Sequence, residues 1–262
     1  MSKPNDVWSP PESDAPAPAP SPGVPPEGGS TDPVDVFRAM WADLSAHPVP
    51  YLLANLGGMA ISTGFTLLML ALMGAAVAPG VALNDDSVLT LGIVAGAVIY
   101  LFGILALIFV VGPPMTASML RGLDRQRRGE GTLGFTSSVN DATARVGAVI
   151  GTNAITTLLT LLGAFFFYLP GLVAMAVGSF ALPIAVFEDV GPWQAWRLAW
   201  AHVRENPAWH AAVFALFFAT LMALEFSVVG LLFVWPVMTA WQLYTYRLAY
   251  GEGGALGANP DR

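Results

Sequence analysis

The chain has 262 residues, of which 55% are hydrophobic and only 11% are charged. A soluble domain has about a quarter charged residues, because its surface must face water. The composition therefore predicts an all-α integral membrane protein. Cysteine is absent, which excludes disulfides, thiolate metal ligands and a cysteine nucleophile. The net charge of −7 comes mostly from an acidic N-terminal tail, and an acidic tail without a basic cluster argues against nucleic acid as a partner.

Residues 1–31 are rich in Pro, Ser, Gly and Ala and show no apolar periodicity. Such a segment buries too little apolar surface to offset the entropy lost on ordering, so we expect a disordered tail. It is either a solvated tail or a ligand for Pro-binding domains of a partner protein. Residues 252–262 are expected to form a flexible C-terminal tail. The first useful apolar stretch begins only after Pro50, so no secretory signal is predicted.

Long stretches without any charged residue outline a membrane domain over residues 32–251. A helix needs roughly 20 apolar residues to cross about 30 Å of hydrocarbon. The turn signal Pro170-Gly171 divides one stretch that is too long for a single crossing. These features predict six transmembrane helices as three hairpins, at about 52–78, 89–119, 146–167, 171–187, 208–226 and 229–249.

The basic residues predict the orientation of these spans. All eleven Lys and Arg residues fall in segments that six spans place on one side of the membrane. Because Lys and Arg are retained in cytoplasmic loops, we expect both termini to be cytoplasmic.

Two amphipathic segments on that side are expected to be helices lying in the headgroup plane. The first, residues 33–45, has Asp32 as its cap, Pro33 at its first position, and a face formed by Val34, Phe37, Met40, Trp41 and Leu44. The second, residues 192–207, carries three tryptophans on one face and Arg197 and Arg204 to one side. The predicted interfacial anchors are Trp41, Trp193, Trp196 and Trp200.

These two segments superpose at an offset of 159 residues, with Trp41 on Trp200 and Pro48 on Pro207. A weaker third copy lies at 135–146. We therefore interpret the chain as three repeats of an interfacial helix followed by a hairpin, at 33–120, 135–187 and 192–250.

Several motifs between Gly112 and Gly251 resemble a family of bacterial six-span proteins. They are GPPMTASML (112–120), YLPGL (168–172), SFALPIAVFEDVGPWQAW (179–196) and RENP (204–207). The family includes the membrane domain attached to some glycerophosphodiester phosphodiesterases, and related inner-membrane proteins that carry only a domain-of-unknown-function label. The resemblance implies the fold and a location in the bacterial inner membrane. The hydrolytic domain of the fusions is missing from this sequence, so their activity is not implied.

No hydrolase, P-loop or metal motif is present, so no catalytic, cofactor-binding or metal-binding residue is predicted. Ser179 follows a glycine in a predicted span, but the sequence lacks the glycine that usually follows a nucleophile, and no histidine is expected to face it. His47, His202 and His210 have no carboxylates at ligand spacing and are interpreted as interfacial side chains.

Two polar residues lie within or beside predicted spans. Glu225 is the only charge between Glu205 and Arg247. It is either an intramembrane functional carboxylate or, as we favour, an ionised residue at the outer interface. Asn153 is interpreted as a helix–helix hydrogen-bonding residue. The spacings Gly92-x-x-x-Gly96 and Gly147-x-x-x-Gly151 indicate close helix packing.

Clustered arginines are the candidate binding residues for anionic lipid headgroups, at about 1 kcal/mol each near the surface. They are Arg121, Arg125, Arg127, Arg128, Arg197 and Arg204. The alternative is that they only fix the topology.

The missing motifs, the tryptophan-rich helices and the arginine cluster together predict a non-enzymatic protein. We expect an accessory or scaffold protein that organises lipids or protein partners at the cytoplasmic leaflet. A small transporter for a lipid or amphipathic substrate is the alternative, favoured by the repeat, the proline-broken helices and Glu225. An intramembrane enzyme is a third option.

Overall fold

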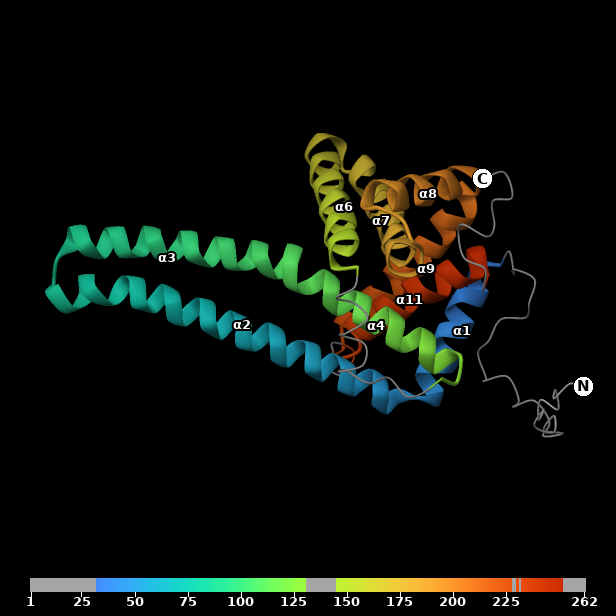
Figure 1. Ribbon diagram of the computed structural model, residues 1–262, viewed down its shortest axis with the longest axis horizontal. Coiled ribbons are helices and arrows are strands. Elements are labelled where there is room, and N and C mark those ends of the chain that lie inside the picture. The colour runs from blue at the N-terminus through green and yellow to red at the C-terminus, as the bar shows by residue number, and fades with distance from the viewer. Residues whose placement is uncertain (1–31, 131–144, 228–229, 231, 252–262) are drawn as a thin grey trace, which may run out of the picture.

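The computed structural model describes residues 32–130, 145–227, 230 and 232–251, and in this part of the chain every regular element is a helix (Figure 1). Both predicted tails lie outside the described residues, and so does nearly all of the predicted third repeat copy at 135–146. The helices are α1 (Pro33–Ala46), α2 (Pro48–Leu83), α3 (Asp86–Ala106), η1 (Leu107–Val111), α4 (Gly112–Arg127), α6 (Val146–Phe167), α7 (Leu169–Phe187), α8 (Pro192–Glu205), α9 (Pro207–Glu225) and α11 (Val234–Tyr250).

Five helices among the described residues are long and apolar enough to cross a membrane. They are Pro48–Leu83, Asp86–Arg127 (α3, η1 and α4 taken together), Val146–Phe167, Leu169–Phe187 and Pro207–Glu225. The sixth predicted span, 229–249, corresponds to α11, which has only 17 residues. Phe233 donates its N–H to the Gly230 carbonyl in a turn before α11, and the helix therefore begins at Val234. The multi-pass membrane class is confirmed, whereas the sixth span stays a prediction.

Helices α2 and α3 form a long antiparallel pair that projects from the rest of the molecule along its longest axis (Figure 1). Glycines bring the two backbones together, because a Cβ atom at Gly92 would lie 2.4 Å from the Ala76 carbonyl oxygen. Gly80 meets the Leu89 backbone in the same way, whereas Gly96 and Gly103 meet the side chains of Met73 and Met69. The predicted small-residue stripe at Gly92 and Gly96 thus packs within this pair.

The second long helix changes geometry where prolines remove backbone donors. Over Leu107–Val111 it is a π-helix, and the Gly112 N–H bonds to the Leu107 carbonyl. Continuing that pattern would pair the Ile108 carbonyl with Pro113, which has no N–H. Asn153 on α6 donates its Nδ2 to the Ile108 carbonyl at 3.2 Å instead. This is the helix–helix role predicted for Asn153.

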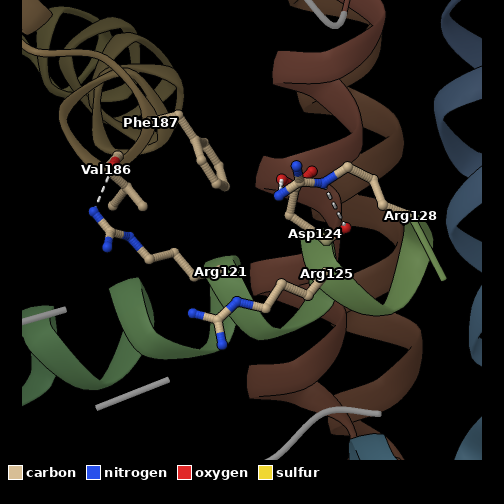
Figure 2. A pocket seen from close by; sticks show the side chains of 6 residues that line it. All are labelled: Arg121, Asp124, Arg125, Arg128, Val186 and Phe187. Atoms are coloured by element: carbon tan, nitrogen blue, oxygen red, sulfur yellow. Dashed lines mark hydrogen bonds and ion pairs between the residues drawn. The ribbon is translucent and has the colours of Figure 1, made fainter. Parts of the chain in front are cut away.

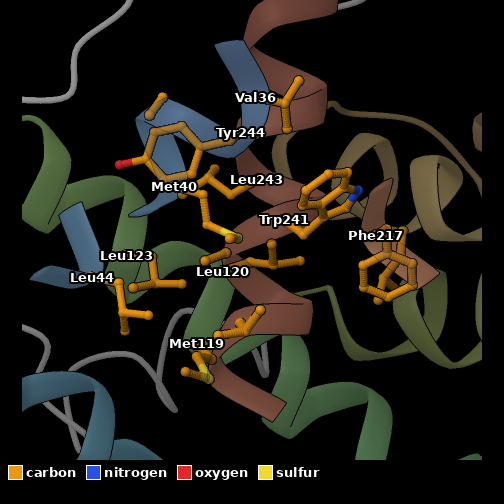
Figure 3. Close-up of a cluster of buried hydrophobic side chains, with 14 of the residues drawn as sticks. Val36, Met40, Leu44, Met119, Leu120, Leu123, Phe217, Trp241, Leu243 and Tyr244 are labelled. Atoms are coloured by element: carbon orange, nitrogen blue, oxygen red, sulfur yellow. The ribbon is translucent and has the colours of Figure 1, made fainter. Parts of the chain in front are cut away.

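The main core surrounds α11, which packs against α1, α4, α7 and α9. Trp241, Leu243 and Tyr244 of α11 are buried there (Figure 3). Side chains of α1, α4 and α9 surround them, including Val36, Met40, Met119, Leu120, Leu123 and Phe217. The central position explains why α11 tolerates polar residues that a lipid-facing helix would not.

The interfacial face predicted for α1 differs from the buried face. Val36, Met40 and Leu44 enter the core, whereas Trp41 is 46% exposed. The buried face is turned about the helix axis relative to the predicted face, because α1 packs against α11 and α9. Trp41 remains on the outside.

The two segments predicted to be repeats have matching geometry. Helices α1 and α8 both have 14 residues and begin with a proline. A single residue joins each to the next proline-led helix, His47 with φ −132° and ψ 53°, and Asn206 with φ −128° and ψ 56°. The helix–proline–helix joint therefore occurs twice with nearly the same backbone.

Candidate functional site: an arginine-lined cavity between α4 and α7

A cavity of about 370 Å³ opens beside the last turns of α4 and α7. Its lining consists of Arg121, Asp124, Arg125, Arg128, Val186 and Phe187 (Figure 2). The arginines lie on one helix face because residues three and four positions apart are neighbours on an α-helix. Val186 and Phe187 come from the last turn of α7, so the cavity has a cationic wall and an apolar wall.

Asp124 is the buried carboxylate beside the lining arginines, and its side chain is 1% exposed. It accepts hydrogen bonds from Arg247 Nε at 3.0 Å and from Arg247 Nη2 at 2.8 Å. Arg128 and Arg127 also pair with it, at 3.0 Å and 3.3 Å. These charged donors offset the cost of burying the Asp124 carboxylate away from water.

Arg121 holds the two walls together. It donates Nη2 to the Val186 carbonyl at 3.0 Å, which Figure 2 shows as a bridge from α4 to the end of α7. That carbonyl belongs to the last turn of α7, where helix carbonyls lack intrahelical partners. The bond fixes α4 relative to α7 and places the guanidinium at the cavity wall.

Among the described residues, three arginines and one carboxylate line the cavity. That carboxylate also pairs with Arg127 and Arg247, which lie outside the lining. Arg128 also pairs with Glu130 at 3.2 Å. Guanidinium groups at one cavity are suited to an anion with several oxygen acceptors.

Two other buried carboxylates bind the same end of α11. Asp43 of α1 lies close to Tyr244 and accepts a hydrogen bond from Tyr51, and Glu188, just after α7, accepts one from Tyr246. Sequence reasoning missed Asp43, Asp124 and Glu188, because their partners lie far away along the chain. The available signal was the presence of acids at the ends of apolar stretches.

The predicted headgroup-binding arginines do not form one group. Arg121, Arg125 and Arg128 line the cavity, whereas Arg127 is 5% exposed and binds Asp124. Because its guanidinium is turned into the protein, Arg127 is not a surface contact. Arg197 and Arg204 are exposed on α8, away from the cavity lining.

Two of the tryptophans of α8, Trp193 and Trp200, are exposed, whereas Trp196 is partly buried and packs against the core. Trp193 is 58% exposed and Trp200 is 41% exposed, whereas Ala195, Leu198 and Ala199 are buried against α6 and α7. The rings of Trp193, Trp196 and Trp200 are nearly parallel, with centroids 6.3 Å and 6.2 Å apart. This face is the one expected to contact lipid.

Glu225, the possible intramembrane carboxylate, is the last residue of α9 and is exposed.

Ser179 and His210 line one small cavity, contrary to the expectation that no histidine faces Ser179. Only about 10 Å³ there is open to the centre of a water molecule, and Ser179 donates its hydroxyl to the Ala176 carbonyl at 2.8 Å. A cavity of that size holds no peptide substrate.

No group of three or more His, Asp or Glu side chains within the described ranges has the spacing for a metal ion. Comparisons with family models, curated proteins and solved structures find no match to the chain. The resemblance to the phosphodiesterase-associated membrane domain therefore stays a prediction, and the arginine-lined cavity is the feature from which a function is best argued.

Proposed function

We propose that this membrane protein is a non-enzymatic scaffold that binds anionic phospholipid headgroups at the cytoplasmic leaflet through the cavity between α4 and α7. The observation that carries the proposal is the placement of Arg121, Arg125 and Arg128 around one cavity of about 370 Å³. This volume is within the range of about 300–1,000 Å³ that is typical of small-molecule sites.

The chemistry of the two walls matches a phospholipid. Guanidinium groups present several N–H donors in a plane and bind phosphate oxygens bidentately. The partly buried Phe187 on the apolar wall offers apolar surface to the glycerol and first methylenes of an acyl chain. An anionic headgroup thus meets the arginines while its chains continue along the apolar surface.

Helix α8 supports the same placement at the membrane surface. Its exposed tryptophan face and its exposed Arg197 and Arg204 have the distribution of an interfacial helix, with aromatic rings at headgroup level and cations toward water. The helix contacts α7, one wall of the cavity, and would hold that wall at the interface.

The proposed topology has six spans with both termini in the cytoplasm of a bacterial cell. Here α11 is the sixth span, enclosed by α1, α4, α7 and α9 rather than by lipid. The support comes from the arginines, which lie at the ends of α4, α8 and α11 and at the start of α6.

Native mass spectrometry of the detergent-extracted protein tests lipid binding. With phosphatidylglycerol as probe, the double variant Arg121→Gln/Arg125→Gln is expected to lose about 25-fold in affinity, because each arginine near the surface contributes about 1 kcal/mol. Phosphatidylcholine, which has no net charge, should bind weakly to both proteins.

The matched control is Arg197→Gln/Arg204→Gln, which removes the same charge from α8. It should change phosphatidylglycerol binding much less than the cavity variant does. Equal losses in the two variants would mean that affinity follows net charge and that the cavity is not the site.

A lipid transporter is the second candidate, favoured by the π-helix at Leu107–Val111 in front of two prolines, since broken helices occur at transporter binding sites. Reconstitution into vesicles with fluorescent phospholipids separates the candidates. The scaffold leaves the lipids in their original leaflet, whereas a transporter moves them across.

A further inference from the structure

The two helix–proline–helix joints place equivalent residues against each other. At the offset of 159 residues, Asp43 corresponds to His202 and Tyr51 corresponds to His210. In the first joint Asp43 and Tyr51 are in contact, and in the second the rings of His202 and His210 are in contact, with centroids 5.1 Å apart. The same backbone joint thus carries two different polar pairs.

In the first joint, polar side chains of the joint bind one another. Asp43 accepts a hydrogen bond from the Tyr51 hydroxyl at 2.5 Å. His47 lies 3.1 Å from the same carboxylate. The Asp43 carboxylate of α1 therefore provides a hydrogen-bond partner for Tyr51 and His47.

The second joint lacks that carboxylate and leaves polar atoms without protein partners. His210 is 6% exposed, and its Nε2 atom has no hydrogen-bond partner among the described residues. Thr245 of α11, also 6% exposed, has no partner for its hydroxyl. Burying such groups without a partner is costly, so native structures satisfy them with protein or with ordered water.

Both groups face one small cavity enclosed by α7, α9 and α11. It is lined by His210 and Thr245 together with Ser179 and apolar neighbours that include Phe180 and Trp241. The volume open to the centre of a water molecule is about 10 Å³, which is about the minimum for one bound water and too small for a larger ligand.

We propose that this cavity is a binding site for a single structural water molecule that bridges His210 Nε2 and the Thr245 hydroxyl. Ser179 is the third partner, because it donates its proton to the Ala176 carbonyl and its oxygen can still accept. A buried water makes about three hydrogen bonds, and these partners come from three different helices. The water therefore acts as the hydrogen-bond partner of His210 in the second joint, as Asp43 does for Tyr51 in the first joint.

An experimental structure of the full chain in a lipid nanodisc, at a resolution that shows ordered water, tests the site directly. The expected result is a peak within hydrogen-bonding distance of both His210 Nε2 and Thr245 Oγ1. A cavity without this peak, in a map that shows other buried waters, would overturn the proposal.

A double-mutant cycle tests the bridge independently and does not depend on activity. Thr245→Val removes the hydroxyl with little change of shape, and His210→Leu removes the ring nitrogen. Each variant should shift the unfolding equilibrium constant about fivefold. Because both act through one water, the double variant should lose much less than the product of the two single shifts. Simple multiplication of the shifts would show that the two groups do not share a ligand.

Discussion

Asp124 is a buried carboxylate that holds Arg128 at the cavity and joins it to Arg127 and Arg247. It lies 1% exposed among Arg127, Arg128 and Arg247, and the guanidinium carbon of Arg247 also lies 4.8 Å from the centre of the Phe187 ring. The carboxylate reduces repulsion among these arginines and orients them. Without it, Arg127 and Arg247 would be buried charges that lack their counter-ion.

Asp124→Asn should therefore destabilise the protein strongly. Removing one partner of a buried ion pair costs about 3–5 kcal/mol, because the remaining charges stay buried. Fluorescence-detected size exclusion after heating would show a lower midpoint and less folded protein.

The control is Asp189→Asn, which removes an acid that pairs with Arg145 and whose side chain is 95% exposed. An exposed pair contributes less than about 1 kcal/mol, so this variant should behave like the wild type. A similar loss in both variants would mean that Asp124 acts only as one surface charge among others.

His202 connects α8 to the core through its ring. It stacks with Phe180 at 5.3 Å and lies 4.8 Å from the Tyr250 ring. Burial lowers the pKa of His202 from its ordinary value of 6.5, and the nearby Glu205 charge opposes this effect. The neutral ring is thus the form that the folded protein favours.

The stability should consequently depend on pH with a definite sign. When the pKa is lower in the folded protein, the unfolded chain binds the proton first as the pH falls. Stability is then full above about pH 6.5 and declines below it. His202→Phe keeps an aromatic ring without a titrating group, and thermal unfolding between pH 7.5 and pH 5 should depend less on pH in this variant. An unchanged pH dependence would assign the effect to other groups.

At the scale of the elements, the positions of the helices could be predicted from the sequence far better than the faces that they bury. Apolar stretches located the five long helices, and Asp32 with Pro33 marked the start of α1, where Asp32 caps the Val34 N–H at 2.9 Å. The buried face of α1 could not be read in the same way, because a lipid-facing and a protein-facing apolar stripe look alike in sequence. The shortness of α11 depends on a turn at Gly230 that hydropathy does not register.

The candidate site could be predicted only in part for a similar reason. The cluster Arg121, Arg125 and Arg128 is local, so its shared helix face follows from spacing. Its counter-ion network joins Asp124 to Arg247, which is 123 residues away. Such a pairing depends on tertiary packing around α11 and leaves no local signal.

The α2–α3 pair offers a test of helix packing with a control in the same helix pair. Gly92→Ala places a methyl group 2.4 Å from the Ala76 carbonyl oxygen, which forces the backbones apart and should cost about 1–3 kcal/mol. Gly64→Ala meets nothing within 4 Å and should be neutral or stabilising by up to about 1 kcal/mol, because alanine is the better helix former. Unfolding of both variants in detergent with increasing SDS would measure the difference. Equal effects would contradict close packing at Gly92.

The whole molecule combines a central body around α11 with a pair of helices that extends well beyond it (Figure 1). Helix α2 has 36 residues, or about 54 Å at 1.5 Å per residue, whereas the hydrocarbon core is about 30 Å thick. A helix of this length must tilt in the bilayer or continue beyond it. The body carries arginines at the ends of α4, α8 and α11, where the proposed topology places the headgroups.

In the proposed topology, the arginine-bearing helix ends face the cytoplasm and the α2–α3 turn faces the other side of the membrane. Single-cysteine labelling tests it without background, since the chain has no cysteine. Asp85, at the α2–α3 turn, and Ser227, after α9, are exposed, as are Glu130 and Glu205 at the arginine-bearing end. An impermeant maleimide applied to intact cells should label Asp85→Cys and Ser227→Cys, and should label Glu130→Cys and Glu205→Cys only after lysis. Labelling of Glu130→Cys in intact cells would contradict the proposed topology and the headgroup site with it.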